Sequence, residues 1–314
     1  MSGRIPVGEV IGESFSFGFG RYLPLLGVAW LPLVVIAALW WFVMMPMMHS
    51  MLAMVAYMSQ HRGTADFSGM PMPNTGGFLG VEILILFCMI WMGMGATKLA
   101  LGKKTGSPFF YLPGKDELNA LVVYIVTYLI LVAGAVVTEI VLLIAGAIVG
   151  VSVGLSGWRP GPAAAPWLGL AAAVVVLALI VAYVYAIIRL MFLIRPITAM
   201  TGKIDIMGSW RTMKGNVLRA FIVALVMALP LIVLEIVACS AMFGSVLAQV
   251  LPNLKSQSPE AIGQMFLAVW MRDMPFIAAG TLLLTPIALG FIAGPAAFAY
   301  RALVPPKTDA APPA

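Results

Sequence analysis

The chain has 314 residues, of which 62% are hydrophobic and 10% are charged, and its formal net charge is +6. Soluble domains are about half apolar and about a quarter charged, so this composition excludes a soluble fold and predicts lipid as the main solvent. Several apolar runs exceed the ~18–20 residues that a helix needs to cross a bilayer. No alternating pattern of a membrane barrel occurs, so the sequence predicts an all-α membrane protein.

The predicted elements begin with a cytoplasmic amphipathic segment at residues 1–23, which carries charged residues and does not read as a cleavable signal peptide. A transmembrane domain follows from residue 24 to 304. Its six predicted spans lie at about 24–45, 78–101, 118–150, 167–194, 217–249 and 275–303. The fold class is therefore a six-helix transmembrane bundle with short interfacial amphipathic helices. A proline-rich tail, residues 305–314, is predicted to be disordered.

Lysine and arginine are distributed unequally between the two sides of these spans. Most lie in the termini and in the loops after the second and fourth spans, and only Arg62, Arg159, Lys255 and Arg272 lie on the other side. The positive-inside rule then predicts that both termini lie in the cytoplasm. Three loops, at about 46–77, 151–166 and 250–274, would face outward, and Pro46 is expected to end or kink the first span.

Three acidic residues, Glu82, Glu139 and Glu235, lie inside the apolar runs. An ionisable group in hydrocarbon is costly and is a functional hypothesis by default. At 1.5 Å per residue, all three are predicted in the outer half of their helices, where they could line one outward vestibule for a ligand or ion. The alternative is that each acid snorkels or hydrogen-bonds locally.

The segment after the first span is rich in methionine and contains both histidines. The candidate metal ligands are Met47, His49, Met51, Met54 and His61. Thioethers are soft ligands that suit Cu(I). The alternative is that methionine is an adaptable apolar filler in a helix that lies on lipid.

A short basic segment precedes the fifth span. Ile206, Met207, Trp210 and Met213 are predicted to form one helical face, and the cations near it are Lys203, Arg211, Lys214 and Arg219. This pattern is typical of an interfacial helix in contact with anionic lipid headgroups, with Trp210 at headgroup depth. The alternative is that the segment merely anchors the following span.

Small residues recur at helical spacing in two places, and Gly290 and Gly294 are one of them. Such spacing lets helix backbones approach closely, and packing within one chain is the favoured reading over a dimer face. No phosphate loop, nucleophile elbow, zinc motif or dinucleotide fingerprint occurs. The sequence therefore predicts no catalytic residues and no cofactor. The basic residues cluster at span ends, which argues against nucleic acid as a partner.

Three short segments resemble a known group of proteins. They are Gly208-Ser-Trp-Arg-Thr-Met-Lys-Gly-Asn-Val-Leu-Arg219, Phe109-Phe-Tyr-Leu-Pro-Gly-Lys-Asp-Glu-Leu118 and Val7-Gly-Glu-Val-Ile-Gly-Glu-Ser-Phe15. The chain resembles bacterial multi-pass proteins grouped with the membrane domain of glycerophosphoryl diester phosphodiesterases. The resemblance implies a six-helix inner-membrane protein. It implies no catalytic residues, because the namesake activity belongs to a separate soluble domain.

Three function classes follow from these observations. The first is a non-catalytic membrane protein that organises envelope lipid or a membrane-protein partner, favoured by the basic amphipathic segments. The second is a transporter or permease for a cation or Cu(I), which would use the three acids and the methionine-rich loop. The third is an intramembrane enzyme, which ranks last because no nucleophile–base pair is visible.

Overall fold

A computed structural model describes residues 3–60, 76–103, 111–156, 165–250, 252 and 258–304. Within these residues all regular secondary structure is helical, and six helices are long and apolar enough to cross a membrane. The predicted fold class is therefore confirmed. The helices are α1 (Val7–Gly20), α2 (Tyr22–Gln60), α3 (Gly76–Ala100), α4 (Lys115–Ser156), α5 (Ala165–Met191), α6 (Ile194–Thr201), α7 (Gly208–Thr212), α8 (Val217–Val250) and α9 (Pro259–Leu303).

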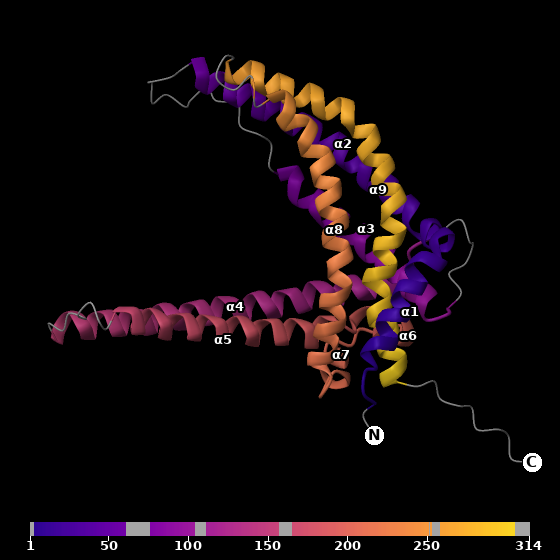
Figure 1. Cartoon of the computed structure of the whole chain (residues 1–314), viewed down its shortest axis with the longest axis vertical. Helices are drawn as coiled ribbons and strands as arrows, with labels where there is room; N and C mark the ends of the chain where they lie inside the picture. The colour runs from indigo at the N-terminus through magenta and orange to yellow at the C-terminus, as the bar shows by residue number, and fades with distance from the viewer. Residues whose placement is uncertain are drawn as a thin grey trace, which may run out of the picture.

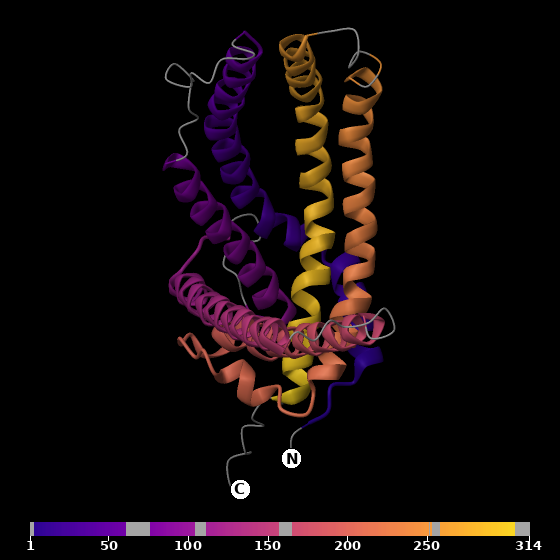
Figure 2. The ribbon, with the colours of Figure 1, turned by 90° about the vertical axis from the view of Figure 1, so that its left-hand side faces the viewer.

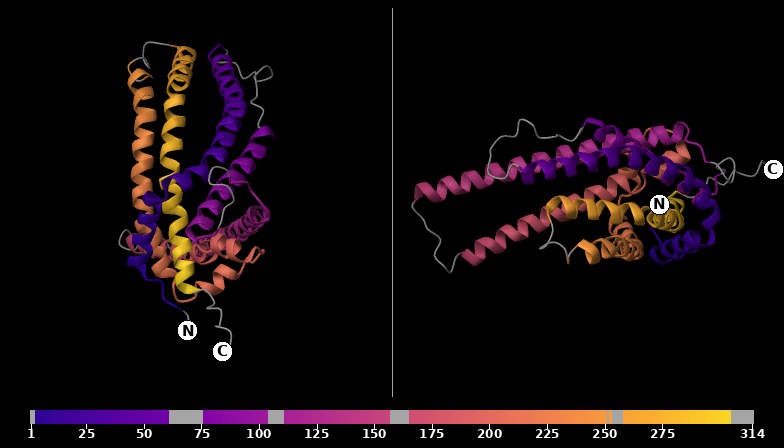
Figure 3. Two further views of the ribbon diagram at one scale, coloured as in Figure 1. Left: turned by 90° about the vertical axis from the view of Figure 1, so that its right-hand side faces the viewer. Right: turned by 90° about the horizontal axis from the view of Figure 1, so that it is seen from above.

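The helices form two regions. Helices α1, α2, α3 and α8 all pack against α9, and α8 and α9 run side by side (Figure 2). Helices α4 and α5 form a hairpin that leaves this group sideways, across the direction of α8 and α9 (Figure 1). The view from above shows the same hairpin projecting away from the other spans (Figure 3). The short helices α6 and α7 lie where the hairpin joins the rest, in contact with α4 and α5 respectively.

Glycine sets the packing of α1 on α9. A Cβ built on Gly294 would lie 3.1 Å from the Ser14 hydroxyl, and one built on Gly290 would collide with the backbone of Gly18. Phe15 and Phe291 pack edge to face beside this contact, with ring centroids 5.0 Å apart. The predicted close approach at Gly290 and Gly294 is thus made within one chain.

The two described ends of the chain lie together. A Cβ on Gly3 would lie 2.8 Å from the carbonyl oxygen of Ala302. The buried side chain of Asn216 fixes the segment that precedes α1. Its Oδ1 accepts from the Ile5 N–H at 3.1 Å, and its Nδ2 donates to the Gly3 carbonyl at 3.1 Å.

Two predicted loops are shorter than the sequence suggested. Helix α2 continues through Pro46 to Gln60, so Pro46 does not end it. Helix α9 begins at Pro259 rather than near residue 275, and the Ser258 hydroxyl caps it by accepting from the Ala261 N–H at 3.3 Å. Serine followed by proline at the first helical position is a helix-start signal that hydropathy does not weigh. The tail from residue 305 lies outside the described residues.

Candidate functional site

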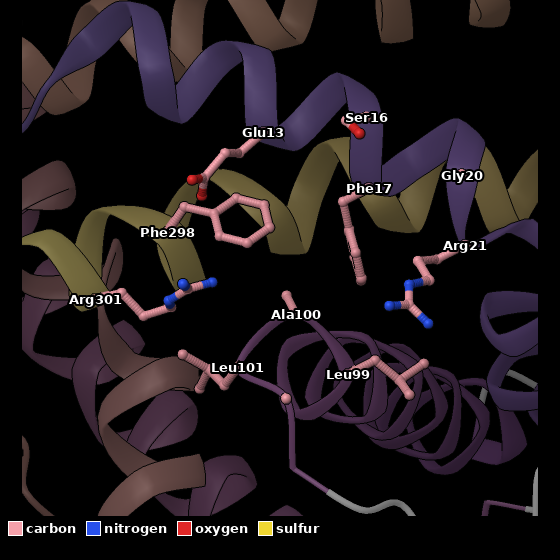
Figure 4. A pocket seen from close by; sticks show the side chains of 11 residues that line it. Glu13, Ser16, Phe17, Gly20, Arg21, Leu99, Ala100, Leu101, Phe298 and Arg301 are labelled. Carbon is pink, nitrogen blue, oxygen red and sulfur yellow. The ribbon is translucent and has the colours of Figure 1, made fainter. Parts of the chain in front are cut away.

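A pocket of about 720 Å³ opens where α1, the end of α3 and the last turns of α9 meet. We call it the arginine pocket. Its wall includes Phe17 and Arg21 from α1 and its end, Leu99 and Leu101 at the end of α3, and Phe298 and Arg301 from α9. Figure 4 shows the guanidinium groups of Arg21 and Arg301 reaching into it from opposite sides.

Helix α3 ends at this pocket in a turn that Gly102 forms. Gly102 has a φ of 74°, its N–H donates to the Leu99 carbonyl at 3.0 Å, and the Lys103 N–H donates to the Lys98 carbonyl at 2.9 Å. This pair of hydrogen bonds is the Schellman motif, in which glycine adopts the left-handed conformation at low cost. The turn leaves Leu99, Ala100 and Leu101 as an apolar floor.

Aromatic packing shapes the side of the pocket. Phe17 and Phe298 are buried and pack edge to face, with ring centroids 5.9 Å apart and an interplanar angle of 85°. The guanidinium carbon of Arg301 lies 5.7 Å from the centroid of the Phe298 ring, within range of a cation–π contact. The pocket therefore offers an apolar floor and two guanidinium groups at its rim, with one carboxylate, that of Glu13, also in its wall.

The two arginines of the rim are not neutralised by any carboxylate that the structure describes. Neither Arg21 nor Arg301 forms an ion pair with a carboxylate of the described residues, although Glu13 also lines the pocket. Lys103 lines a smaller adjoining pocket of about 280 Å³ that shares Arg21. Each cation also lies near a helix C-terminus, where carbonyl dipoles stabilise positive charge, so helix capping is the competing explanation of their placement.

A buried polar network fixes the last turn of α3 from the side of α4. Glu117 has a fully buried side chain and accepts from Lys98 Nζ at 2.8 Å, from the Gly114 N–H at 2.6 Å and from the Tyr111 hydroxyl. Lys98 also pairs with Asp116 at 3.0 Å. The network anchors the residues just before the pocket floor.

Tyr111 is the part of this network that links it to the middle of α3. Its carbonyl accepts from the Trp91 indole N–H at 3.0 Å. Burial, and then the hydrogen bond to Glu117, raise the pKa of the Tyr111 phenol well above its usual value. The phenol consequently stays protonated and acts as a donor throughout the physiological range.

The residues predicted to contact anionic lipid lie around α7. The Trp210 ring packs against Arg189, whose guanidinium carbon is 4.0 Å from the ring centroid. Arg211 forms an exposed ion pair with Asp205 at 2.8 Å, and Arg219 donates to the Ile5 carbonyl at 3.2 Å. Lys203 and Lys214 are exposed.

The predicted helical face in this segment is shorter than expected. Helix α7 spans five residues, Gly208–Thr212, and Met213 is fully buried in the core. The apolar face therefore serves internal packing at Met213 and remains exposed at Met207. Lipid contact by the cations of this segment stays a prediction.

The three intramembrane acids lie on three different helices. Glu82 is on α3, Glu139 on α4 and Glu235 on α8, and all three are exposed. Within the described residues no three acidic, histidine or cysteine side chains gather closely enough to hold a metal ion. Glu139 lines a groove between α4 and α5 that neither Glu82 nor Glu235 lines.

The methionine-rich segment is described only in part. His49 lies on α2 and is exposed, and its Nδ1 donates to the Met45 carbonyl at 2.8 Å. That bond assigns the proton to Nδ1 and leaves Nε2 as the free ring nitrogen. Met54 is half-buried on α2. The side chains of Met47 and Met51, and the whole of His61, lie outside the described residues, so the metal site stays a prediction.

Comparison with known proteins adds no relative, because no family model, no curated protein and no solved structure matches the chain. The site must be judged on its own geometry. Analysis of the sequence did not select Arg21 and Arg301, which stand at opposite ends of the chain. The only sequence feature that marks these two arginines is their position at the end of an apolar run, and most cations of this protein share that position.

Proposed function

We propose that this protein is a non-catalytic, multi-pass protein of the bacterial inner membrane that binds anionic lipid at the end of the molecule where its two described ends meet. The observation that supports this is the arginine pocket, where Arg21 and Arg301 face an apolar floor and neither forms an ion pair with a described carboxylate, including that of Glu13 in the pocket wall. Guanidinium groups match phosphate oxygens in geometry and charge, and an apolar floor suits the first part of an acyl chain.

The proposed orientation supports the same reading. The excess of lysine and arginine at this end would place the pocket at the cytoplasmic surface. That leaflet carries anionic lipid, and each cation near it contributes about 1 kcal/mol to binding. The resemblance to the membrane domain grouped with glycerophosphoryl diester phosphodiesterases also stays a proposal, and it agrees with a lipid-associated role.

Lipid add-back to the purified full-length protein tests this function. The protein would be stripped of lipid in a mild detergent, then titrated with phosphatidylglycerol or phosphatidylcholine, and bound lipid counted by native mass spectrometry. The wild type should bind phosphatidylglycerol more tightly. The Arg21→Gln/Arg301→Gln double variant should lose about 2 kcal/mol of that binding, or roughly thirtyfold in affinity.

The matched control is Arg4→Gln, because Arg4 is an exposed arginine near the same end that does not line the pocket. It should bind phosphatidylglycerol like the wild type. If the wild type shows no preference for the anionic lipid, the proposed function is wrong. If the control loses as much affinity as the double variant, diffuse surface charge explains the binding and the pocket does not.

The transporter reading is the second candidate, favoured by one observation. Glu139 lines a long groove between two apolar helices, where a cation could be held. Transporters commonly bind substrate at discontinuous helices, whereas α4 and α5 are each assigned as one unbroken helix. The groove itself carries a more specific inference.

A further inference from the structure

A groove with a volume of about 800 Å³ runs between α4 and α5. The α4 residues that line it run from Ile130 to Leu142 and the α5 residues from Val176 to Leu190, so at 1.5 Å per residue it extends over roughly 18–21 Å. Small residues such as Gly134 and Ala186 line its course and leave room between the two helices. We call it the α4–α5 groove.

One acidic side chain interrupts the apolar lining. Among the described residues that line the α4–α5 groove, Glu139 is the only charged one. It forms no ion pair with a described residue. The neighbouring hydroxyl of Thr138 is occupied, because it donates to the Gly134 carbonyl at 2.8 Å. The carboxylate is therefore the one charged group that the described lining offers to a ligand, beside the hydroxyl of Tyr183.

Aromatic and apolar side chains line the other end of the groove. Met207 and Trp210 line it there. Arg189 lies beyond the lining, where it donates to the Trp210 carbonyl at 3.1 Å and to the Tyr185 hydroxyl at 3.1 Å. A ligand in the groove would meet Glu139 near one end and an indole ring at the other.

We propose that the α4–α5 groove binds a lipophilic cation, a molecule with an elongated apolar body and one positive charge that pairs with Glu139. An unpaired carboxylate in an apolar environment is costly, and a cation offsets that cost while the apolar body fills the groove. An anionic lipid would place like charge against Glu139, and a neutral chain would leave the carboxylate without a partner. This inference is independent of the proposed function, because it uses different residues and a ligand of opposite charge.

The test uses purified full-length protein in an uncharged detergent. The probe is a styrylpyridinium dye, an elongated cation whose fluorescence rises in an apolar site, and the comparison ligand is its uncharged stilbene analogue. The wild type should bind the cation more tightly than the analogue. Glu139→Gln should weaken cation binding by at least about tenfold, the factor expected for one charge-assisted contact in an apolar site.

Two further variants make the result specific. Glu235→Gln removes another exposed intramembrane acid that does not line the groove, and it should bind the dye like the wild type. Ala186→Trp should fill the groove and block the dye and the analogue alike. Equal affinity for dye and analogue, equal effects of the two glutamine variants, or undiminished binding by Ala186→Trp would each overturn the proposal.

The same proteins separate this site from the arginine pocket. Glu139→Gln should keep the wild-type affinity for phosphatidylglycerol, which shows that the variant is folded. The Arg21→Gln/Arg301→Gln variant should keep the wild-type affinity for the dye. Loss of dye binding in the double arginine variant would mean that the cation does not occupy an independent site, and the proposal would fail while the lipid function stood.

Discussion

Helices α3 and α5 are both apolar enough to span a membrane, yet the protein surrounds them very differently. In the most apolar stretch of the span Gly80–Ala100, on α3, 56% of the residues are buried inside the protein. In the most apolar stretch of the span Leu170–Thr201, which contains most of α5, the share is 0%. An apolar sequence therefore predicts that a helix avoids water. It does not predict whether the helix is surrounded by lipid or by other helices of the protein. Lipid is as apolar as a protein core, so the choice depends on small residues and on polar partners.

The region around α3 has such partners, and the α4–α5 hairpin has few. Lys98 and Glu117 join α3 to the start of α4, and Gly93 and Gly95 leave room for Arg195 and Val28 respectively. Along α5 the valine-rich middle is exposed on all sides that the structure describes. The first region is expected to carry the stability of the protein, and the second to carry exposed binding surface. Four pairs of matched variants test this division.

The largest effect is expected at the polar anchor of α3. Glu117→Ala removes the acceptor of Lys98, Tyr111 and the Gly114 N–H, and breaking a buried ion pair in this way costs about 3–5 kcal/mol. Tryptophan fluorescence during a titration of sodium dodecyl sulfate into mixed micelles would measure the free energy of unfolding. The control Asp205→Ala breaks the exposed pair with Arg211 and should cost about 0–1 kcal/mol. Similar losses in both variants would contradict the assigned role of the anchor.

The next comparison changes leucine to alanine in each region. Leu25 on α2 is 0% exposed and Leu177 on α5 is 61% exposed. Leu25→Ala should lower the free energy of unfolding by about 2 kcal/mol or more, because it leaves a cavity in packed protein. Leu177→Ala should change it by less than about 0.5 kcal/mol, because lipid fills the space. A large loss at Leu177 would mean that another chain covers the hairpin.

A glycine pair on α9 sharpens the comparison within one helix. Gly290→Ala would push against the backbone of Gly18 and should cost about 1–3 kcal/mol. A Cβ on Gly280 meets nothing within 4 Å, so Gly280→Ala should be neutral or stabilise the helix by up to about 1 kcal/mol. Both substitutions would be followed by the same unfolding titration. Opposite signs are expected, and a loss of equal size at both positions would refute the close approach of α1 and α9.

The sequence predicted the elements of this fold better than their surroundings. Hydropathy found the six helices of the described residues that are long and apolar enough to cross a membrane, because a run of about 20 apolar residues has few other uses. It missed the first turns of α9, since Glu260 and Arg272 lower the apolar content of a segment that Ser258 nevertheless starts as a helix. It could not predict the sideways course of α4 and α5, because that depends on contacts between residues distant in the chain.

The candidate site was harder to predict for the same reason. Arg21 and Arg301 meet only because α1 packs on the last turns of α9, and no local pattern marks either residue. Glu117 was noticed only within the segment Phe109–Leu118 that carries the family resemblance. Glu139 was selected from the sequence because an acid in an apolar run is rare, but its groove depends on the pairing of α4 with α5.

The smallest expected effect concerns two buried threonines, Thr97 on α3 and Thr127 on α4, both 0% exposed. The Thr97 hydroxyl donates to the Gly93 carbonyl at 2.7 Å, whereas the Thr127 hydroxyl has no hydrogen-bond partner among the described residues.

Valine has nearly the same shape as threonine without the hydroxyl. Thr97→Val should therefore cost about 1 kcal/mol, the net contribution of one hydrogen bond. Thr127→Val should be neutral or stabilise the protein by up to about 1 kcal/mol, because it removes a buried polar group that has no partner. The unfolding titration would decide the sign. If Thr127→Val destabilised the protein as much as Thr97→Val, the Thr127 hydroxyl would have to be hydrogen-bonded in the folded protein.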